Sequence, residues 1–439
     1  MLASKGGISL DISDEELDGL FSEALSRALE EIKGSGPVII LPPDVTRLHS
    51  HSGFLTGVAA RELSSRNPSR LGAVMPALGT HMPMTSQELE RMFPHTPQDK
   101  FLVHDWRNDV ETLGRIEGSF VEKLSDGRVS YDWPVQVNKR LSSGAFSMIL
   151  SIGQIVPHEV TGMANHLKNI FVGTGGKEAI DKSHFLGASY GMERMMGRAE
   201  TPVRALFDEG YKRYGSRIPP VLFALTVLSP RSDSEAEKAG KKRGSLAMRG
   251  IFIGFGRDCF VEAAALSRQV NVDFLDESIK KAVVYLEPEE FRTTWLGNKA
   301  IYRTRMAMAD DGELLILAPG LQRFGEDIGV DKLIRTYGYR TGGLILEKAE
   351  KEKELAQNLG VAAHLIHGSS EGRFTVRYCP GTGLSRSEIE QVGYEWGSLD
   401  EAVLRYDVNK LSLGWNTLPD GERIFFVPNP ALGLWVKRN

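Results

Sequence analysis

The chain has 439 residues, 41% of them hydrophobic and 25% charged, a composition typical of a globular protein with more than one core. A formal net charge of −4, from 53 basic and 57 acidic residues, excludes the basic footprint of a protein that binds nucleic acid or an anionic membrane. Without an apolar run near the roughly 18 residues that span a bilayer, and without a signal-peptide pattern at its start, the sequence predicts a soluble, cytoplasmic protein.

The first part of the chain alternates between helical and strand patterns. Apolar residues recur at helical spacing after Ser13, short apolar runs indicate buried strands, and Thr85 and Glu88 form a capping box that begins a helix. The predicted elements here are a helix over 13–33, a strand over 38–41, a helix over 54–63, strands over 71–78, 101–104 and 146–156, a hairpin over 120–137, and a strand over 222–228. This alternation predicts an α/β architecture.

A second, smaller α/β domain is predicted after a change in composition near residue 270. Its predicted elements are strands over 281–286, 313–317 and 373–378, a helix over 287–308 that is interrupted near Gly297, and a helix over 347–358. We expect a larger domain over 1–270, completed by a C-terminal strand over 423–439, and a smaller one over 275–418. The fold prediction is therefore two α/β domains with a cofactor and substrate cleft between them.

Polar residues gather just beyond the predicted strand ends. These residues are Asp44, Thr46, Arg47, Thr80, His81, His104 and His158. In open parallel sheets, ligands bind at the carboxyl ends of the strands, so this placement predicts an active site in the first domain. Eight of the ten histidines precede residue 185, which favours the same domain.

Each candidate has a structural alternative. His81 and His158 suit general acid–base catalysis, but a capping or hydrogen-bonded loop histidine fits either position equally well. The glycine-rich stretch 173–177 after Lys168 suggests a phosphate cradle, although it lacks the spacing of a P-loop. His184 taken alone is typical of a core histidine. The residues themselves indicate a site with imidazoles, an arginine and a lysine, suited to an anionic substrate.

The motifs, taken in order, resemble those of the nickel-dependent lactate racemase family. The similarity consists of Asp44-x-Thr-Arg47, Gly79-Thr-His81-x-Pro83, Pro157-His158-x-x-x-Gly162, Lys168, His184, Trp295-x-x-x-Lys299 and the closing Leu432-Gly-Leu-Trp-Val-Lys437. These motifs run from the first domain into the second and to the C-terminus, so the resemblance extends over the whole chain.

The resemblance implies a cofactor and a set of roles. Lys168 would carry a covalently attached nickel-pincer nucleotide, and His184 would complete the coordination of the nickel, a metal that imidazole suits. Asp44 and Thr46 lie in the motif that contacts the cofactor. Listed by expected role, the remaining residues are the acid–base pair His81 and His158 and the substrate-binding residues Arg47, Lys299 and Trp295. The implied activity is racemisation or epimerisation of a 2-hydroxyacid by hydride transfer.

The chain departs from the family pattern at several points. Asn165-His166-Leu167 replaces Gly-Gly-Arg, Trp295 replaces a tyrosine, and Leu296 stands where a glutamine is expected. A glycine-rich stretch of the second domain is shortened to 323–326. Because Leu296 removes an amide while His49 and His51 follow Arg47 with further polar groups, we expect a polyhydroxy (aldonic) acid such as gluconate rather than lactate.

Two other functions are compatible with the same residues. A zinc-type hydrolase would use the histidine cluster as metal ligands, and a non-catalytic homologue would bind the nickel nucleotide without turnover. The expected partner is a small hydroxyacid, with neither nucleic acid nor membrane.

Overall fold

A computed structural model describes residues 1–32, 34–242 and 244–438. Lys33, where the sequence ends the first predicted helix, and Asn439, the last residue of the predicted C-terminal strand, lie outside them. The chain divides into two compact units, one formed by Met1–Leu186 and Met195–Asn271 and the other by Gly187–Arg194 and Val272–Asn439. Both units combine sheets with helices, as the sequence predicted.

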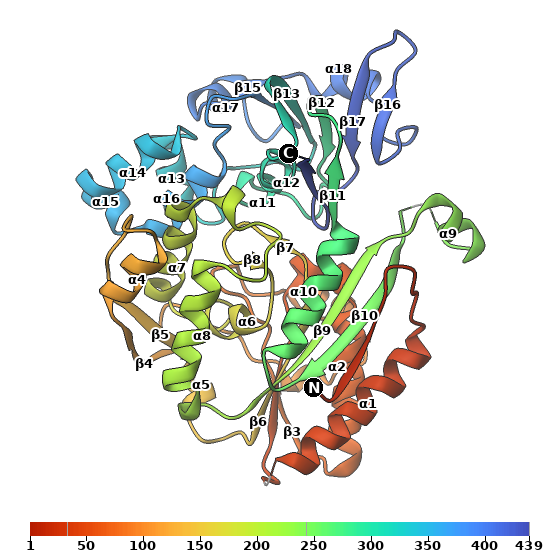
Figure 1. Ribbon diagram of the computed structural model, residues 1–439, viewed down its shortest axis with the longest axis vertical. Helices are drawn as coiled ribbons and strands as arrows, with labels where there is room; N and C mark the ends of the chain where they lie inside the picture. The colour runs from red at the N-terminus through yellow and green to blue at the C-terminus, as the bar shows by residue number, and fades with distance from the viewer. Residues whose placement is uncertain (33, 243, 439) are drawn as a thin grey trace. The chain divides into compact units, whose positions relative to one another are not determined.

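The first unit is built on a mixed sheet with the strand order β1-β10-β9-β6-β2-β3 (Figure 1). Its strands are β1 (Ala3–Gly6), β2 (Val38–Leu41), β3 (Leu71–Val74), β6 (Met148–Gln154), β9 (Val221–Pro230) and β10 (Leu246–Gly254). The neighbouring strands β3, β2, β6 and β9 run parallel, whereas β10 is antiparallel to β9 and β1 to β10. The carboxyl ends of β3, β2 and β6 therefore open on one edge of the sheet.

The helices α1 (Asp14–Glu31) and α2 (Ser52–Arg66) pack against this sheet. Ser13 caps α1 by accepting a hydrogen bond from the amide of Glu16, and three acidic residues occupy its first turn. Its buried face consists of Leu17, Phe21, Ala24, Leu25, Ala28 and Leu29. Burial of each large apolar side chain contributes about 1.5–3 kcal/mol, so this face dominates the attachment of the helix.

Further elements complete the first unit. They are η1 (Val45–Ser50), α3 (Ser86–Met92), η2 (Gln98–Lys100), β4 (Val110–Ile116), α4 (Gly118–Leu124), β5 (Trp133–Asn138), α5 (Lys139–Ser142), β7 (Pro157–His158), β8 (Gly162–Met163), α6 (Leu167–Phe171), α7 (Lys177–Tyr190), α8 (Pro202–Tyr214), η4 (Gly215–Arg217), α9 (Asp233–Lys238) and α10 (Asp258–Asn271). The capping box of Thr85 and Glu88 begins α3, as predicted. Helix α10 lies along β9 and β10 (Figure 1).

Two predictions for this unit are wrong, the strand over 101–104 and the hairpin over 120–137. Residues 101–104 contribute only an isolated bridge from Phe101 to Val74, because the segment turns away after that residue. The predicted hairpin over 120–137 is instead helix α4 followed by strand β5, which pairs with β4. The turn at Ser125-Asp-Gly127 ends that helix instead of joining two strands: the Ser125 amide bonds back to the Val121 carbonyl.

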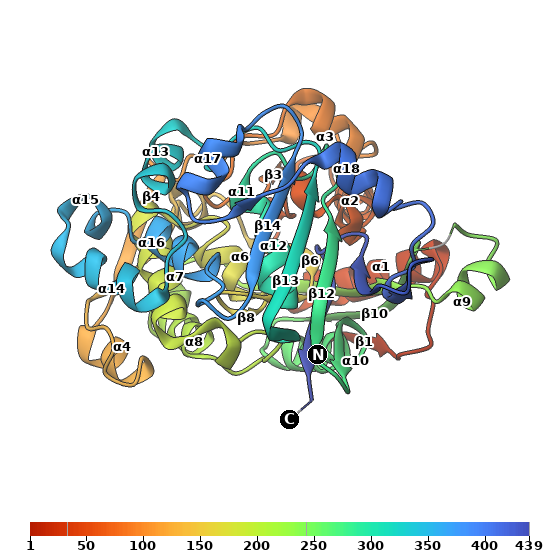
Figure 2. The same ribbon diagram turned by 90° about the horizontal axis from the view of Figure 1, so that it is seen from above.

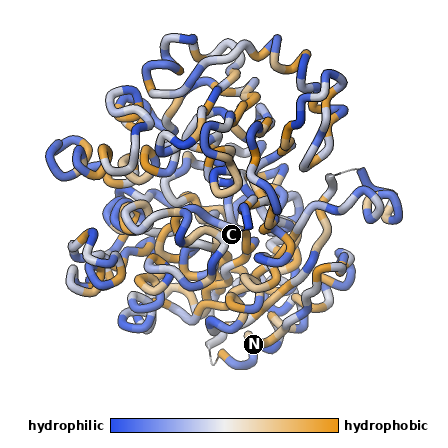
Figure 3. The backbone as a smooth tube through the Cα atoms, turned by 45° about the horizontal axis from the view of Figure 1, so that its top comes forward, coloured by the Kyte–Doolittle hydropathy of each residue, from blue (hydrophilic) through white to orange (hydrophobic). Residues whose placement is uncertain are grey.

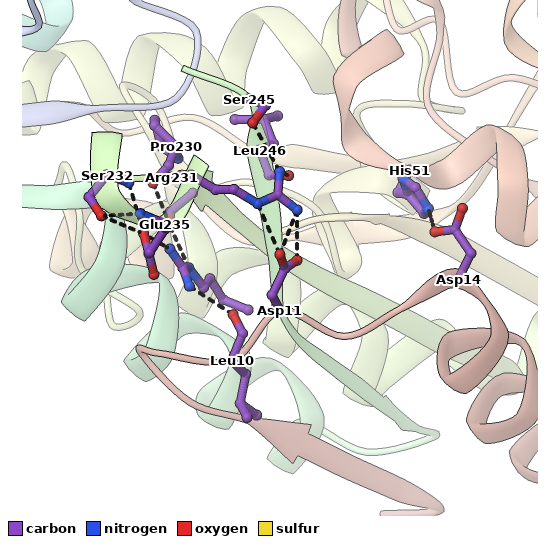
Figure 4. Close-up of polar contacts among 12 residues, drawn as sticks. Leu10, Asp11, Asp14, His51, Pro230, Arg231, Ser232, Glu235, Ser245 and Leu246 are labelled. Atoms are coloured by element: carbon purple, nitrogen blue, oxygen red, sulfur yellow. Dashed lines mark hydrogen bonds and ion pairs between the residues drawn. The ribbon is translucent and has the colours of Figure 1, made fainter. Parts of the chain in front are cut away.

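A polar cluster secures the N-terminal segment and the β9–β10 hairpin (Figure 4). Arg231 donates to both carboxylate oxygens of Asp11, at 2.7 and 2.8 Å. Arg249 is 3% exposed and donates to the Leu10 carbonyl at 2.8 Å, the Ser229 hydroxyl at 2.9 Å and the Glu235 carboxylate at 2.9 Å. A buried guanidinium is tolerated here because most of its donors are satisfied.

The second unit contains a mostly parallel sheet with the order β15-β14-β13-β12-β17-β16 (Figure 2). A short parallel pair, β11–β18, lies outside this sheet. The elements of the unit are η3 (Met192–Arg194), β11 (Val272–Leu275), β12 (Ile279–Tyr285), α11 (Thr294–Gly297), α12 (Lys299–Thr304), β13 (Met308–Ala318), α13 (Ile328–Tyr337), α14 (Gly342–Lys351), α15 (Lys353–Ala356), α16 (Leu359–His367), β14 (Thr375–Pro380), α17 (Arg386–Gln391), β15 (Glu395–Trp396), α18 (Leu399–Arg405), β16 (Gly414–Thr417), β17 (Arg423–Val427) and β18 (Leu434–Lys437).

The C-terminal segment belongs to this second unit, so the prediction that it completes the first domain is wrong. Strand β17 pairs in parallel with β12, and β18 pairs in parallel with β11. Both are apolar, with Phe425, Phe426 and Leu434 nearly fully buried. The sequence pattern predicted terminal strands correctly but carried no information about which sheet would receive them.

Hydrophobic and hydrophilic stretches alternate along the backbone in Figure 3, and many of the outermost loops are hydrophilic. Within the described ranges, no helix has both the length and the apolar character needed to cross a bilayer.

The Arg249 cluster generates the first prediction. Arg249→Met should lower the free energy of unfolding by about 2 kcal/mol, because Glu235 is partly hydrated and its unpaired charge costs less than a fully buried one. Exposed Lys238→Met is the control and should change little. The bond from Arg249 is the largest cause that lowers the pKa of Glu235 to about 2, from 4.5, so this stabilisation is present above pH 4.5 and lost as pH falls through about 2.

Urea unfolding of both variants and the parent from neutral to acidic pH measures the effect. The difference between the parent and Arg249→Met should shrink on acidification. A difference that is absent at neutral pH, or that grows in acid, would contradict the prediction.

Candidate active site

The predicted site residues of the first unit follow three neighbouring strands of its sheet. Asp44 and Arg47 come directly after β2, His81 follows β3, and His158 follows β6. Because these strands are parallel neighbours, their carboxyl ends bring the three loops together. Lys168 lies on the first turn of α6, which is fixed to the same edge.

His81 and Asp44 form a hydrogen-bonded pair. The His81 Nδ1 lies 2.5 Å from Asp44 Oδ2, and Asp44 Oδ1 accepts from the Thr46 amide at 3.2 Å and its hydroxyl at 2.6 Å. Burial raises the pKa of the Asp44 carboxyl, but the charge of His81 and the bonds from His81 and Thr46 together hold that pKa below its ordinary value. Asp44 is therefore an anion that orients the imidazole.

His158 is buried and has a different hydrogen-bond pattern. Its Nδ1 accepts from the amide of Val160 at 3.1 Å, and its Nε2 faces the Glu159 carboxylate at 3.8 Å. Burial holds the pKa of His158 well below its usual value; Glu159 opposes this effect, and the charges of Lys168 and Arg47 add to it. The ring is therefore neutral near pH 7.

Helix α6 places Lys168 at the strand ends. The side-chain amide of Asn169 donates to the Leu41 carbonyl and to the Ser151 hydroxyl, both at 3.0 Å, which ties the helix to the end of β2 and the middle of β6. The Gly79 amide donates to the Gly173 carbonyl at 2.9 Å, so the loop that carries His81 is joined to the end of the same helix.

Lys168 is an activated amine. Burial lowers its pKa from 10.5 to about 8, and the charge of Arg47 contributes further. Arg47 itself has a buried Nη1 without a hydrogen-bond partner. A buried guanidinium donor left unpaired next to a buried amine is costly unless an anionic group satisfies it. The pair therefore fits an anionic ligand.

His184 lies on α7 and is oriented by the backbone of its own helix. Its Nδ1 donates to the Ile180 carbonyl at 2.7 Å, which leaves the lone pair on Nε2. Burial and the charge of Lys168 lower its pKa to about 4. A neutral imidazole with a defined Nε2 lone pair is the form that ligates a metal.

Other histidines have structural contacts. His51 begins α2 with a left-handed backbone, stacks at a tilt on Phe54, and points its Nε2 at Asp14 at 2.7 Å (Figure 4). His49 is half-buried on η1. His104 bonds through Nε2 to the Gly175 carbonyl and through Nδ1 to the Asn138 amide, both at 3.0 Å, so both its nitrogens hold the protein together.

The glycines after Lys168 serve close packing. A Cβ at Gly173 would meet the Asn169 carbonyl oxygen at 2.4 Å, and one at Gly175 would meet that of Phe171 at 2.0 Å. These close contacts explain why glycine is needed at both positions: the chain packs tightly against α6. A phosphate-binding role, which the sequence suggested, is not required to explain them.

The second unit holds Trp295 and Lys299 on α11 and α12. Trp295 stacks on His364 with ring centroids 4.3 Å apart, and the hydroxyls of Tyr302 and Tyr339 each lie 2.9 Å from a nitrogen of that imidazole. Lys299 is 9% exposed, with its ammonium 5.3 Å from the ring of Phe291. The aromatic support of Trp295 has no signature in the sequence, because its three members come from two helices and a loop that are separate in sequence.

The structure adds residues that sequence reasoning missed. Glu159 lies beside His158, and its charge acts on Lys168 and His184 as well. Its position directly after a candidate histidine was the available signal. Fully buried Arg204 donates to the carbonyls of Asn165 and Met163, at 3.1 and 2.6 Å, and nothing in its amphipathic helix distinguishes it.

Asn165 and His166, which replace the two glycines of the family motif, keep a glycine-like backbone. Their φ angles are 60° and 58°, in the left-handed region. The His166 ring packs against Phe223 and Phe260, with centroids 4.0 and 5.1 Å away. The two positions before Leu167 thus have a backbone that glycine adopts readily, although neither residue is glycine.

The residues at the strand ends fit a nickel nucleotide held through one lysine and one imidazole. Lys168 supplies a buried nucleophilic amine, His184 a metal-ligating nitrogen, and Arg47 an unpaired donor for an anion. A zinc hydrolase would need three protein ligands. Among the residues described, no group of three or more His, Cys, Asp or Glu side chains is arranged to hold a metal ion.

Comparisons with known proteins agree with this arrangement. Residues 20–195 match the family model of the lactate racemase N-terminal domain. A protein from Thermotoga maritima of known crystal structure superposes with a TM-score of 0.80 at 22% identity, over 99% of this chain and 100% of that one. The lactate racemase apoprotein from Thermoanaerobacterium thermosaccharolyticum superposes with a TM-score of 0.68 at 15% identity, over 98% and 94%.

The search among curated proteins returned no match. The two structural likenesses concern the fold, and the family model concerns the segment that carries Asp44, His81, His158, Lys168 and His184. The matched segment, residues 20–195, is thus similar to the lactate racemase N-terminal domain, in agreement with the resemblance of its motifs, and the solved structures show the same fold.

Proposed function

We propose that the chain is a 2-hydroxyacid racemase or epimerase that uses a nickel-pincer nucleotide attached to Lys168. The observation that carries the proposal is the buried amine of Lys168 among Arg47, His158 and His184 at the carboxyl ends of parallel strands. The match of residues 20–195 to the model of the lactate racemase N-terminal domain supports the same activity class.

The charges of the site favour a substrate carboxylate. Arg47 has a buried, unpaired Nη1, and its positive charge acts on both His158 and Lys168. A carboxylate bound there would pair with the guanidinium in a bidentate manner and offset the repulsion between the cations. We propose the same role for Lys299 of the second unit, with Trp295 beside it.

The nickel nucleotide, when bound, would accept the C2 hydrogen of the substrate as hydride and return it. Lys168 would hold the nucleotide covalently, and His184 would ligate its nickel through Nε2. Asp44 and Thr46 lie next to the same edge and would contact it. Around it, Arg47 would orient the substrate carboxylate, and His81 and His158 would contact the substrate hydroxyl.

Hydride transfer suits a 2-hydroxyacid better than proton abstraction does. Removing the α-proton beside a carboxylate would build a second negative charge on one small molecule, which is costly. Removal of hydride together with the hydroxyl proton gives a neutral carbonyl instead. The protein's task is then to hold the carboxylate, move one proton and exclude water.

We further propose a substrate longer than lactate, an aldonic acid such as gluconate inverted at C2. Leu296 offers no amide to a small hydroxyacid, and half-buried His49 lies two residues from Arg47. His51 contributes less than its sequence position suggests, because its Nε2 faces Asp14. Polar groups left unpaired by a short substrate would favour one with more hydroxyls.

The attachment site gives the second prediction. Protein made in a cell that synthesises the nickel nucleotide should carry an added mass on Lys168 and about one nickel per chain. Lys168→Ala should lose both, and His184→Ala should keep the added mass but lose nickel affinity by about 10-fold or more. Exposed Lys177→Ala is the matched control. Peptide mass spectrometry and metal analysis measure the outcome; an active enzyme with unmodified Lys168 would refute the attachment.

The lowered pKa of Lys168 gives the third prediction, for protein without cofactor. Burial disfavours the ammonium form, so the reactive free amine should appear as pH rises through about 8, well below the ordinary value of 10.5. Competitive labelling with a small acylating reagent, read peptide by peptide, compares Lys168 with Lys177 across pH. A midpoint for Lys168 near 10 would contradict the desolvated environment.

The substrate proposal gives the fourth prediction. Gluconate should show a higher kcat/KM than lactate, malate, 2-hydroxyglutarate or glycerate when inversion or exchange of the C2 hydrogen is followed. Leu296→Gln, which restores the missing amide, should shift the preference toward lactate by about 10-fold, the worth of one good hydrogen bond. A parent enzyme that prefers lactate to every sugar acid would overturn the aldonic acid assignment.

A further inference from the structure

His81 and His158 are held in opposite tautomers. The ionised Asp44 carboxylate accepts from His81 at 2.5 Å, so the proton of a neutral His81 ring is on Nδ1 and the lone pair on Nε2. At His158 the donor is the backbone: the Val160 amide donates to Nδ1 at 3.1 Å, so Nδ1 holds the lone pair and Nε2 carries the proton. The two rings therefore present different atoms outward.

The surroundings of His158 favour the same tautomer. Its Nε2 faces the Glu159 carboxylate at 3.8 Å, and a carboxylate is attracted to an N–H. A second proton on this ring would have to bind Nδ1, where it would meet the Val160 amide hydrogen. The ring is also more enclosed: its side chain is 7% exposed, against 31% for His81.

We propose that the two histidines are unequal: His81 is the proton carrier of the reaction, and His158 is a fixed hydrogen-bond donor to the substrate oxygen. This inference rests on the proposed racemase function and goes beyond the acid–base pair that the resemblance implies.

The proton and electrons balance with one carrier. In the first half-reaction the hydroxyl proton would move to Nε2 of His81 and the C–O bond would become a carbonyl, with the bound nucleotide supplying the acceptor for the C2 hydride. Asp44 would stabilise the imidazolium so formed, as the aspartate does in a Ser-His-Asp triad. In the second half-reaction, once the hydride has been given back to the other face of C2, His81 would return the same proton to the oxygen. His158 keeps its proton throughout and donates from Nε2.

The first test uses protein without cofactor. NMR of ring-15N-labelled histidine, assigned with His81→Gln and His158→Gln, reports which nitrogen of each ring is protonated. At neutral pH we expect a protonated Nε2 and a bare Nδ1 for His158, and a protonated Nδ1 for His81. A proton on Nδ1 of His158, whether alone or in a doubly protonated ring, would overturn the proposal.

The second test uses cofactor-loaded enzyme and the same matched pair of variants. Glutamine offers an amide N–H donor but cannot carry a proton. His158→Gln should lose about 10-fold or less in kcat, the worth of one imperfect hydrogen bond. His81→Gln should lose about 100- to 10,000-fold, the loss typical of a missing general base. Equal losses in folded variants that both retain the Lys168 adduct would contradict the unequal roles.

The two tests separate this inference from the proposed function. If the loaded parent enzyme inverts no hydroxyacid, the function fails whatever the NMR result. If it is active but His158 carries a proton on Nδ1, the function stands and the unequal roles fail.

Discussion

The removal of Lys168 from water is the constraint on which the site depends. A buried amine next to Arg47 can be maintained only if the surrounding backbone is rigid and its own polar groups are satisfied. Asn169 contributes to this by anchoring α6 to the end of β2 and the middle of β6. The same short helix therefore holds the reactive group and closes the sheet edge, and a change that loosens one disturbs the other.

The two carboxylates of the site, Asp44 and Glu159, act in different ways. Asp44 is committed to His81 and Thr46, whereas Glu159 acts at longer range on His158, Lys168 and His184. Arg47 keeps a buried Nη1 without a hydrogen-bond partner, which leaves this donor available to a ligand. A preorganised donor of this kind favours the binding of an anionic ligand, because no carboxylate among the described residues already occupies it.

Much of the architecture could be predicted from the sequence, because short apolar runs such as Val38–Leu41 and a capping box at Thr85 have few alternative conformations. The prediction of a hairpin over 120–137 was wrong because the same turn residues occur between two strands and at the end of a helix. The prediction of which sheet holds the C-terminal strands was wrong because strand pairing depends on partners that are distant in sequence. Motif residues such as His158 were found from a resemblance, whereas its tautomer depends on a backbone amide that no sequence pattern reveals.

The strand order of the first unit has a consequence for synthesis of the chain. Every motif histidine and Lys168 has been translated by residue 184, yet β6, in the middle of the site, pairs with β9, and β1 pairs with β10 through contacts about 250 residues apart in sequence, such as Ala3 with Ile253. Until β9 emerges, β6 is an open edge strand that invites pairing with another chain. Residues 20–195, although they match a family model, therefore do not complete the sheet, because one edge of β6 stays unpaired until β9 joins it.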